Sequence, residues 1–264
     1  MTTLLESVIA AVKSAADVMK NTDFTVETKE AKENIVTSSD KRVQEFLYEA
    51  LGTLLPHSGF FGEEDVTDFR EAEYVWIVDP IDGTTNYARG IRDCAISVGL
   101  EHAGEPVLGV VYLPYQEELF YAERGAGAYL NGAPIHVSDK PFENGLLCTA
   151  FSVYRKSLAD TCMSVVRDMY AECADFRRFG SAAAELCYLA AGRCDLYFEI
   201  RVFPWDFAGA AVILTEAGGA LCTLAGAAPS LRAPMPLIGA NSKENLDRML
   251  AHVDKYIKEV PYCE

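Results

Sequence analysis

The sequence predicts a layered α/β protein in which helices cover the faces of sheets. Three observations support this fold class. Apolar residues recur at helical spacing near the start of the chain, short apolar runs follow between Tyr74 and Leu130, and a second set of helices and strands follows Pro141. Strands grouped in runs between groups of helices are typical of sheets that bury their apolar faces under helices.

Two helices are expected in the first 54 residues. Residues 1–20 alternate apolar positions with Glu6, Lys13 and Asp17 at a period that indicates an amphipathic helix, not a signal peptide. A second helix is expected to run to about residue 54. Ser38, Ser39 and Asp40 are each suitable N-cap residues for it.

The remaining elements follow in order. Residues 74–130 contain short apolar runs separated by Gly, Pro and Glu, which predict strands of one sheet joined by tight turns. Helices are expected near 156–170 and 181–191, then a strand over 194–200. Pro204 is a favoured first helical residue, and Gly218 and Gly219 predict the end of the helix that it begins. A last helix is expected near 242–257.

Length and charge limit the classes of function. A chain of 264 residues, half of them apolar, predicts one domain, with lobes of approximately 1–140 and 141–264. The net charge of -16 argues against direct binding to nucleic acid or to anionic membranes. The same charge would repel a phosphorylated substrate unless cations gathered locally.

The cysteines and apolar runs predict a cytoplasmic protein. The eight cysteines form no C-x-x-C pair and match no histidine spacing, which favours buried thiols in a reducing compartment. No apolar run approaches the roughly 18 residues of a membrane span. The four histidines are scattered, and no catalytic role is assigned to them.

The segment "WIVDPIDGTTNY" at residues 76–87 carries the first chemical signal. It places Asp79 and Asp82 where an apolar strand breaks into a turn, with Pro80 preventing further strand pairing. Two carboxylates held together repel each other, and a divalent cation relieves the repulsion. Oxygen ligands without nearby Cys or His favour Mg²⁺ over zinc. The alternative is an ordinary Asp-Pro-Gly turn with capping side chains.

Three further carboxylates have two interpretations each. Glu63 follows an apolar stretch and is either a metal ligand or a solvated loop charge. Asp206 lies in the first turn of an apolar helix beside Trp205, where it is either a functional acid or only complements the helix dipole. In residues 195–200, strand alternation sends Glu199 to the face opposite Leu196, where it faces either substrate hydroxyls or solvent.

Three segments in this order, "GEE", "WIVDPIDGTTN" and "PWDFAGAAVILTEAGG", resemble the inositol monophosphatase family across nearly the whole chain. The segment "FGSAAAELCYLAAGRCDLYFEI" is similar to the bacterial branch. The combination is highly specific, whereas D-x-x-D alone is weak. The resemblance implies an α-β-α-β-α sandwich of the inositol monophosphatase type, a homodimer, and a lithium-sensitive phosphatase with two or three Mg²⁺ ions in each site.

The resemblance also implies a set of metal ligands. Glu63 would bind the first metal and also act in catalysis. Asp79 would bridge two metals, and Ile81 would contribute its backbone carbonyl. Asp82 and Asp206 would complete the second metal site. One Mg²⁺ would lower the pKa of a bound water, and the second would stabilise the leaving alcohol oxygen.

Other residues resemble the family's catalytic and substrate contacts. Thr84 looks like the hydroxyl that orients the attacking water, and Asp40 looks like its acidic partner. The backbone N–H groups of Gly83 and Thr84 would hold the phosphate. Glu199 is similar to the contact with a substrate hydroxyl. The chain departs from the family after the T-T-N run, where a proline is missing, so two interpretations of Arg89 and Arg92 stay open, in which they either contact substrate or face water.

Three functions remain open at this point. The first is a Mg²⁺-dependent phosphatase acting on inositol monophosphate or a similar polyol or sugar phosphate. The second keeps the chemistry but acts on fructose 1,6-bisphosphate, histidinol phosphate or a 3'-phosphonucleotide. The third adds a role as a binding protein, because some bacterial relatives act in RNA-polymerase complexes. Intact ligands at every metal position favour catalysis.

Overall fold

The computed structural model describes residues 1–21, 23–28, 35–64, 67–68, 72–151 and 156–257. The helices are α1 (Thr3–Lys20), α2 (Ser38–Leu54), α3 (Thr84–Ala88), α4 (Ala159–Tyr170), α5 (Ala182–Ala190), α6 (Pro204–Glu216) and α7 (Lys243–Val253). Short 3-10 turns lie at Phe142–Asn144 and Lys156–Leu158.

The strands form three sheets. Their bounds are β1 (Val26–Thr28), β2 (Ile35–Thr37), β3 (Gly59–Gly62), β4 (Thr67–Asp68), β5 (Tyr74–Asp82), β6 (Ala95–His102), β7 (Glu105–Leu113), β8 (Glu118–Glu123), β9 (Ala128–Leu130), β10 (Ala133–Ile135), β11 (Leu146–Ala150), β12 (Asp175–Arg177), β13 (Leu196–Val202), β14 (Ala220–Cys222) and β15 (Met235–Ala240). The large sheet has the order β10-β9-β8-β7-β6-β5-β3-β4, the second β12-β11-β13-β15-β14, and β1 pairs with β2.

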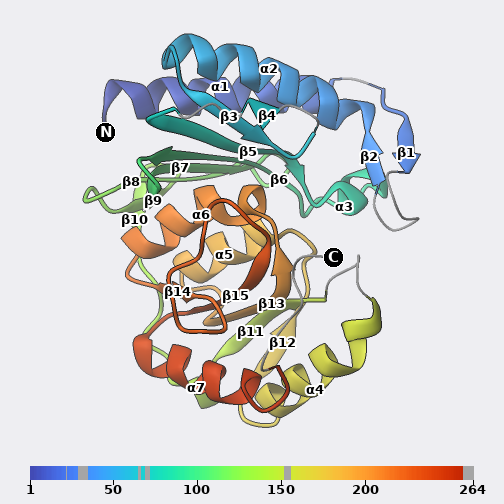
Figure 1. The fold of residues 1–264 in the computed structure, drawn as a ribbon, viewed down its shortest axis with the longest axis vertical. Helices are drawn as coiled ribbons and strands as arrows, with labels where there is room; N and C mark the ends of the chain where they lie inside the picture. The colour runs from blue at the N-terminus through green and yellow to red at the C-terminus, as the bar shows by residue number, and fades with distance from the viewer. Residues whose placement is uncertain (22, 29–34, 65–66, 69–71, 152–155, 258–264) are drawn as a thin grey trace.

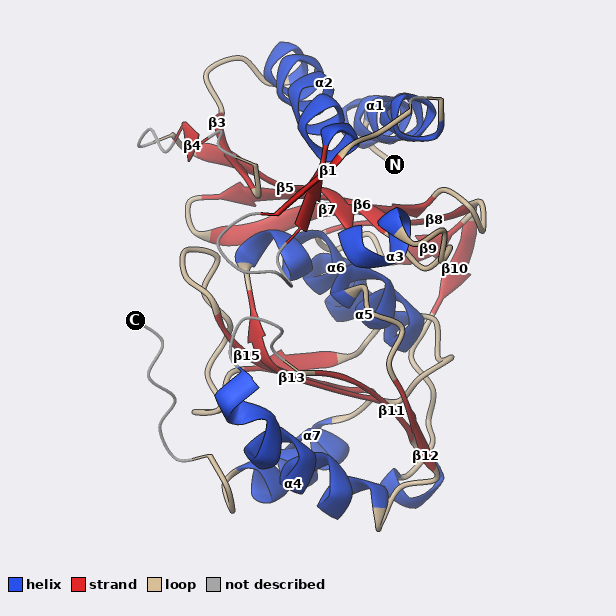
Figure 2. Cartoon of the chain, turned by 90° about the vertical axis from the view of Figure 1, so that its right-hand side faces the viewer, coloured by secondary structure: helices blue, strands red, loops and turns tan. Residues whose placement is uncertain are grey.

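The elements stack in five layers (Figure 1). Helices α1 and α2 cover one face of the large sheet, and α5 and α6 lie between the two large sheets. Helices α4 and α7 cover the outer face of the second sheet, as Figure 2 also shows. The predicted layered α-β-α-β-α fold is therefore confirmed.

Strand β5 has both faces buried, which explains its continuous apolar sequence. Trp76 and Val78 pack in the core under α1 and α2, while Val75 and Ile77 pack in the core under α5 and α6. This alternation brings the end of β5 between the two helical layers. The carboxylates that follow Val78 therefore lie inside the molecule.

Glycines let α6 lie directly on the large sheet. A Cβ atom built on Gly209 would come within 2.8 Å of the carbonyl oxygen of Val98 in β6. Side chains at this contact would push the helix away from the sheet. The close approach brings the first turn of α6, which contains Asp206, toward the end of β5.

The structure corrects several predicted boundaries. The N-cap of α2 is Thr37, and Asp40 is instead the acidic member of a capping box. The α-helix expected from 156 begins at Ala159 after a 3-10 turn, and α7 ends at Val253 before the expected residue 257. Strand β13 begins at Leu196 rather than 194, because residues 194 and 195 end the connection from α5.

The predicted buried thiols are confirmed where the structure describes them. Seven cysteines are free and buried, and Cys263 lies outside the described residues. Within the described parts of the chain, the structure contains no helix long and apolar enough to cross a membrane.

Candidate functional site

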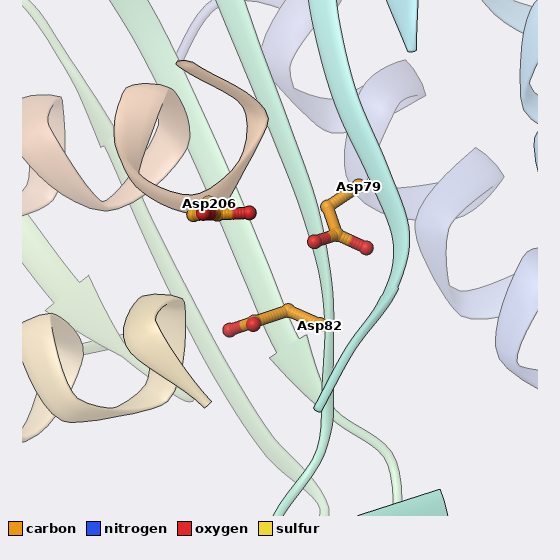
Figure 3. Close-up of side chains that lie close together, drawn as sticks. All are labelled: Asp79, Asp82 and Asp206. Atoms are coloured by element: carbon orange, nitrogen blue, oxygen red, sulfur yellow. The ribbon is translucent and has the colours of Figure 1, made fainter. Parts of the chain in front are cut away.

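Three aspartates meet where β5 ends and α6 begins. One carboxylate oxygen from each of Asp79, Asp82 and Asp206 lies within 4.8 Å of the others. Their side chains point toward one another from two different elements (Figure 3). The arrangement brings together the paired aspartates of "DPID" and the aspartate of "PWDF", which are more than a hundred residues apart in sequence.

Hydrogen bonds fix one oxygen of each aspartate. The backbone N–H of Ile81 donates to Asp79 Oδ1 at 2.9 Å. Asp82 Oδ2 accepts from the Ser181 hydroxyl at 2.6 Å and from the Ala183 N–H at 2.7 Å. The Phe203 N–H donates to Asp206 Oδ2 at 2.7 Å. Each carboxylate is held by one oxygen, which leaves the other oxygen for a cation.

Burial and mutual repulsion raise the pKa values of the three aspartates. Burial is the largest cause of the raised pKa of Asp79, followed by the charges of Glu63, Asp82 and Asp206. Burial raises the pKa of Asp82 to about 6, although its hydrogen bond from Ser181 opposes the shift. The pKa of Asp206 is also well above its ordinary value, through burial and then the charge of Asp82. A divalent cation would remove this penalty.

The aspartates open into a cavity of about 500 Å³. Glu63, which follows β3, lines it together with Ile81, Gly83 and Thr84. The structure thus brings Glu63 beside the three aspartates, as predicted for one site. The neighbouring acid of the same motif, Glu64, is buried, and its backbone N–H donates to Gln44 Oε1 at 2.9 Å. Glu64 therefore helps to hold this loop in place.

Thr84 and Asp40 lie in contact. The Thr84 hydroxyl is 3.3 Å from Asp40 Oδ1 and 3.1 Å from the Ile81 carbonyl oxygen. Asp40 is completely buried, and its Oδ2 accepts from the Thr37 N–H at 2.8 Å. The carboxylate is therefore held rigidly by the capping box of α2. A hydroxyl that donates to Asp40 presents its lone pairs to the cavity, where they can accept a hydrogen bond from water.

Gly83 provides the sharp turn between β5 and α3. Its φ is +88°, and a Cβ atom there would lie 3.0 Å from the Asp93 carbonyl oxygen, so only glycine fits without strain. Among the described residues, none accepts a hydrogen bond from the backbone N–H of Gly83 or Thr84. Both N–H groups are thus available to an anion in the cavity.

Glu199 lines the same cavity from β13. The predicted alternation is confirmed, since Leu196, Phe198 and Ile200 pack under α4 and α7. The opposite face was expected to be open. In the structure it is covered by α5 and α6 (Figure 2). The Tyr197 hydroxyl donates to Glu199 Oε2 at 2.8 Å, and burial raises the pKa of Glu199 to about 7.

Several cavity residues were missed in the sequence. Ser181 caps α5 and binds Asp82, Glu185 supports the loop before α5, and Arg178 and Arg201 line the cavity. The N-cap pattern of Ser181 was a readable signal, but its contact with Asp82 spans 99 positions. Of the loop without an assigned role, Arg89 lines the cavity.

A layered α-β-α-β-α fold with a buried carboxylate cluster at a strand end defines the class as an α/β protein with a candidate metal site. The chain belongs to the inositol monophosphatase family, whose sequence pattern matches residues 1–258. It is 35% identical to Nus factor SuhB of Vibrio cholerae serotype O1 over 256 residues, 95% of each chain. The extragenic suppressor protein suhB of Bartonella henselae superposes with a TM-score of 0.89 at 30% identity, covering 97% of this chain and 100% of that chain.

Two other solved structures of this fold are complexes with ligands. An IMPase/NADP phosphatase in complex with Mg²⁺ and phosphate has a TM-score of 0.84 at 25% identity, covering 94% of this chain and 93% of that chain. SaIMPase-II with bound inositol monophosphate has a TM-score of 0.80 at 26% identity, covering 97% and 94%. Family membership and the acidic cluster together indicate a metal site.

Proposed function

We propose that the protein is a Mg²⁺-dependent phosphomonoesterase that hydrolyses myo-inositol monophosphate or a similar polyol phosphate. The observation that carries the proposal is the convergence of Asp79, Asp82 and Asp206 within 4.8 Å. Beside this cluster, the Thr84 hydroxyl donates to the buried carboxylate of Asp40. Membership of the inositol monophosphatase family and the Mg²⁺ and phosphate in a related structure support it.

The carboxylates fit a hard cation. Glu63, Asp79, Asp82, Asp206 and the Ile81 carbonyl would hold Mg²⁺, since all are oxygen donors at one end of the cavity. When bound, the metal supplies a water of lowered pKa and charge stabilisation at the leaving oxygen. Two or three ions per site would offset the negative charge of the cluster, so that a phosphate can enter an acidic protein.

This chain's own residues would orient the reaction. Thr84 would orient the attacking water by accepting a hydrogen bond from it, while its own hydroxyl proton is directed to Asp40. Glu63, which lines the same cavity, would contribute to activating this water. The Gly83 and Thr84 N–H groups would bind phosphate oxygens. Glu199 would accept hydrogen bonds from hydroxyls of the leaving alcohol, and the inositol monophosphate bound to SaIMPase-II supports this substrate class.

Other properties of the family are part of this proposal. We expect inhibition by Li⁺ and a homodimer from the family resemblance, and a cytoplasmic location from the buried free thiols. We expect a single domain because α5 and α6 pack against both large sheets. Fructose 1,6-bisphosphate, histidinol phosphate and 3'-phosphonucleotides remain alternative substrates for the same chemistry.

A second, additional role is transcription-associated, because several relatives that align over most of this chain are named Nus factors. The metal-type cluster favours catalysis as the primary function, since a pure binding role would not need it. Binding of purified RNA polymerase to wild-type protein and to Asp82→Asn tests the added role. Equal binding by both would separate that role from catalysis, and no binding by either would remove it.

A phosphate-release assay tests the primary function. Purified protein with Mg²⁺ would be given inositol, sugar, amino-alcohol and nucleotide monophosphates at equal concentrations. We expect the highest kcat/KM for a polyol phosphate. Release from none of these compounds would overturn the phosphatase assignment, and the highest kcat/KM for a nucleotide or histidinol phosphate would replace the polyol.

A further inference from the structure

Helix α2 directs two buried polar side chains toward the candidate site. Asp40 and Gln44 are four residues apart, so they lie on the same face of the helix. Asp40 is completely buried and Gln44 is 1% exposed. Asp40 supports the hydroxyl of Thr84, which lies 3.3 Å from Asp40 Oδ1. The contacts of Gln44 lead to a different part of the same site.

Gln44 binds the backbone of Glu64 through both ends of its carboxamide. Its Oε1 accepts from the Glu64 N–H at 2.9 Å, and its Nε2 donates to the Glu64 carbonyl oxygen. A carboxamide offers one donor and one acceptor side by side, which matches the N–H and C=O of one extended residue. The side chain thus makes the pair of hydrogen bonds that a neighbouring antiparallel strand would make.

Gly62 leaves the space that this contact needs. A Cβ atom built on Gly62 would lie 2.6 Å from Gln44 Cδ and closer still to its Oε1. The φ of Gly62 lies outside the left-handed region, so glycine here provides room and not an unusual backbone conformation. Any side chain at position 62 would push the carboxamide away from Glu64.

Glu63 lies between two anchored points of the backbone. Its own N–H donates to the Val78 carbonyl oxygen at 3.2 Å, which continues the pairing of β3 with β5 by one residue. The next residue, Glu64, is held by Gln44. The backbone is therefore fixed on both sides of the Glu63 Cα atom, and the residue lines the cavity that the aspartates open into.

We infer that Gln44 is a positioning residue for Glu63, and that α2 sets the distance between Glu63 and Thr84. The inference rests on the proposed function, in which both residues act on the attacking water. The Thr84 hydroxyl is tied to α2 through Asp40, and Glu63 is tied to it through Gln44 and the Glu64 backbone. Loss of a residue that orients a metal ligand from behind costs about ten- to hundredfold in metal affinity or activity.

Gln44→Met tests this role, because methionine fills a similar buried space without the donor and the acceptor. Mg²⁺ binding to the metal-free protein would be measured by calorimetric titration, and turnover by phosphate release from myo-inositol monophosphate. We expect Mg²⁺ affinity and kcat to fall about ten- to hundredfold. KM for inositol monophosphate at saturating Mg²⁺ should change little, because the Gly83 and Thr84 N–H groups still bind the phosphate.

A double-mutant cycle tests whether Gln44 acts through Glu63. Glu63→Gln removes the carboxylate that Gln44 positions, and Gln44→Met is then added to this variant. The second substitution should change Mg²⁺ affinity less than about twofold in the Glu63→Gln background, because no ligand is left to misplace. A loss in this background as large as the loss in the wild-type background would overturn the inference.

Two further variants separate position from stability. Gly62→Ala displaces the carboxamide without removing it, so it should lower Mg²⁺ affinity as Gln44→Met does, and it provides the same test if Gln44→Met does not fold. Leu51→Ala is the control, because Leu51 is buried on the same helix two turns beyond Gln44. It should lower Tm while Mg²⁺ affinity and kcat stay at the wild-type level.

The outcomes distinguish this inference from the proposed function. A wild-type protein that binds no Mg²⁺ and releases no phosphate overturns the proposed function. Wild-type binding and release, with Mg²⁺ affinity and kcat unchanged in both Gln44→Met and Gly62→Ala, overturn the positioning role alone. A loss of Mg²⁺ affinity in Leu51→Ala equal to that in Gln44→Met also overturns it, because a weakened helix would then explain both.

Discussion

The Ser181 hydroxyl donates to Asp82 Oδ2 at 2.6 Å, and this bond joins the start of α5 to the end of β5. Both side chains are buried, with exposed fractions of 1% for Ser181 and 8% for Asp82. The Ala183 N–H donates to the same oxygen. The second half of the chain thus fixes a carboxylate that belongs to the first half.

Replacing Ser181 tests whether this bond orients a metal ligand. A hydrogen bond to a buried charge contributes about 1.5 to 3 kcal/mol, so Ser181→Ala should weaken Mg²⁺ binding about ten- to hundredfold. The measurement is calorimetric titration of the metal-free protein with Mg²⁺. Ser242→Ala is the control, because Ser242 is also an N-cap that accepts from a backbone N–H. An Mg²⁺ affinity equal in both variants would contradict the positioning role.

Removing one charge from the cluster should stabilise the metal-free protein. The raised pKa of Asp82, about 6, means that the folded state holds the proton more tightly than the unfolded chain. The contribution of protonated Asp82 to the free energy of unfolding is fully present below the unfolded pKa of about 4. It is lost as pH rises through the folded pKa of about 6. Asp82→Asn should therefore raise Tm in the absence of metal at pH 7.5, with an effect of at most about 3 kcal/mol.

Thermal melts at two pH values provide the check. The difference in Tm between Asp82→Asn and wild type should shrink at pH 4, where the folded state is protonated and the unfolded state is about half protonated. Mg²⁺ should stabilise only the wild type at pH 7.5. Asp247→Asn is the control, since Asp247 is exposed and paired with Lys243. A lower Tm for metal-free Asp82→Asn at pH 7.5 would show that the carboxylate stabilises the fold.

Thr84 should act on turnover more than on metal binding. Thr84→Ala removes the hydroxyl that lies 3.3 Å from Asp40, so kcat should fall by about a hundredfold or more, within the range of proton-transfer groups. Mg²⁺ affinity should change little. Thr84→Ser restores the hydroxyl and should recover most of the rate. A serine variant as slow as the alanine variant would mean that the methyl group, not the hydroxyl, supports activity.

Glu199 should determine the preference for polyols. Glu199→Gln should lower the ratio of kcat/KM for inositol phosphate over an aryl phosphate by about ten- to hundredfold, because a charged acceptor of substrate hydroxyls is lost. The pKa of Glu199 is about 7, and the carboxylate accepts these hydrogen bonds when ionised. The wild-type ratio should therefore rise between pH 6 and 8. A wild-type ratio that is flat with pH, or a variant ratio that is unchanged, would remove Glu199 from substrate recognition.

The sequence predicts the fold well because its helices and strands have clear periods. The amphipathic pattern of α1 and the Pro204 start of α6 are local signals, and both were predicted correctly. The N-cap of α2 was not predicted correctly, because Thr37, Ser38 and Ser39 are chemically similar. Only packing decides which of these hydroxyls lies at the helix end.

The candidate site is harder to predict from the sequence than the fold is. Strand and turn chemistry brings Asp79 and Asp82 together, whereas the position of Asp206 beside them depends on the glycine contact between α6 and the large sheet. The N-cap pattern predicts a helix start at Ser181 but not its contact with Asp82, and a strand arginine such as Arg201 gives no signal of a site. Their contacts with the cavity arise from tertiary structure alone.

The most direct test of the central claim is a Mg²⁺ titration of phosphate release from myo-inositol monophosphate, after complete removal of metal with a chelator. We predict no release without metal, recovery as Mg²⁺ is added, and no recovery for Asp79→Asn, whose buried carboxylate is one of the three in the cluster. Undiminished release in excess chelator, or full recovery of Asp79→Asn at the wild-type Mg²⁺ concentration, would contradict a metal-dependent site at these aspartates.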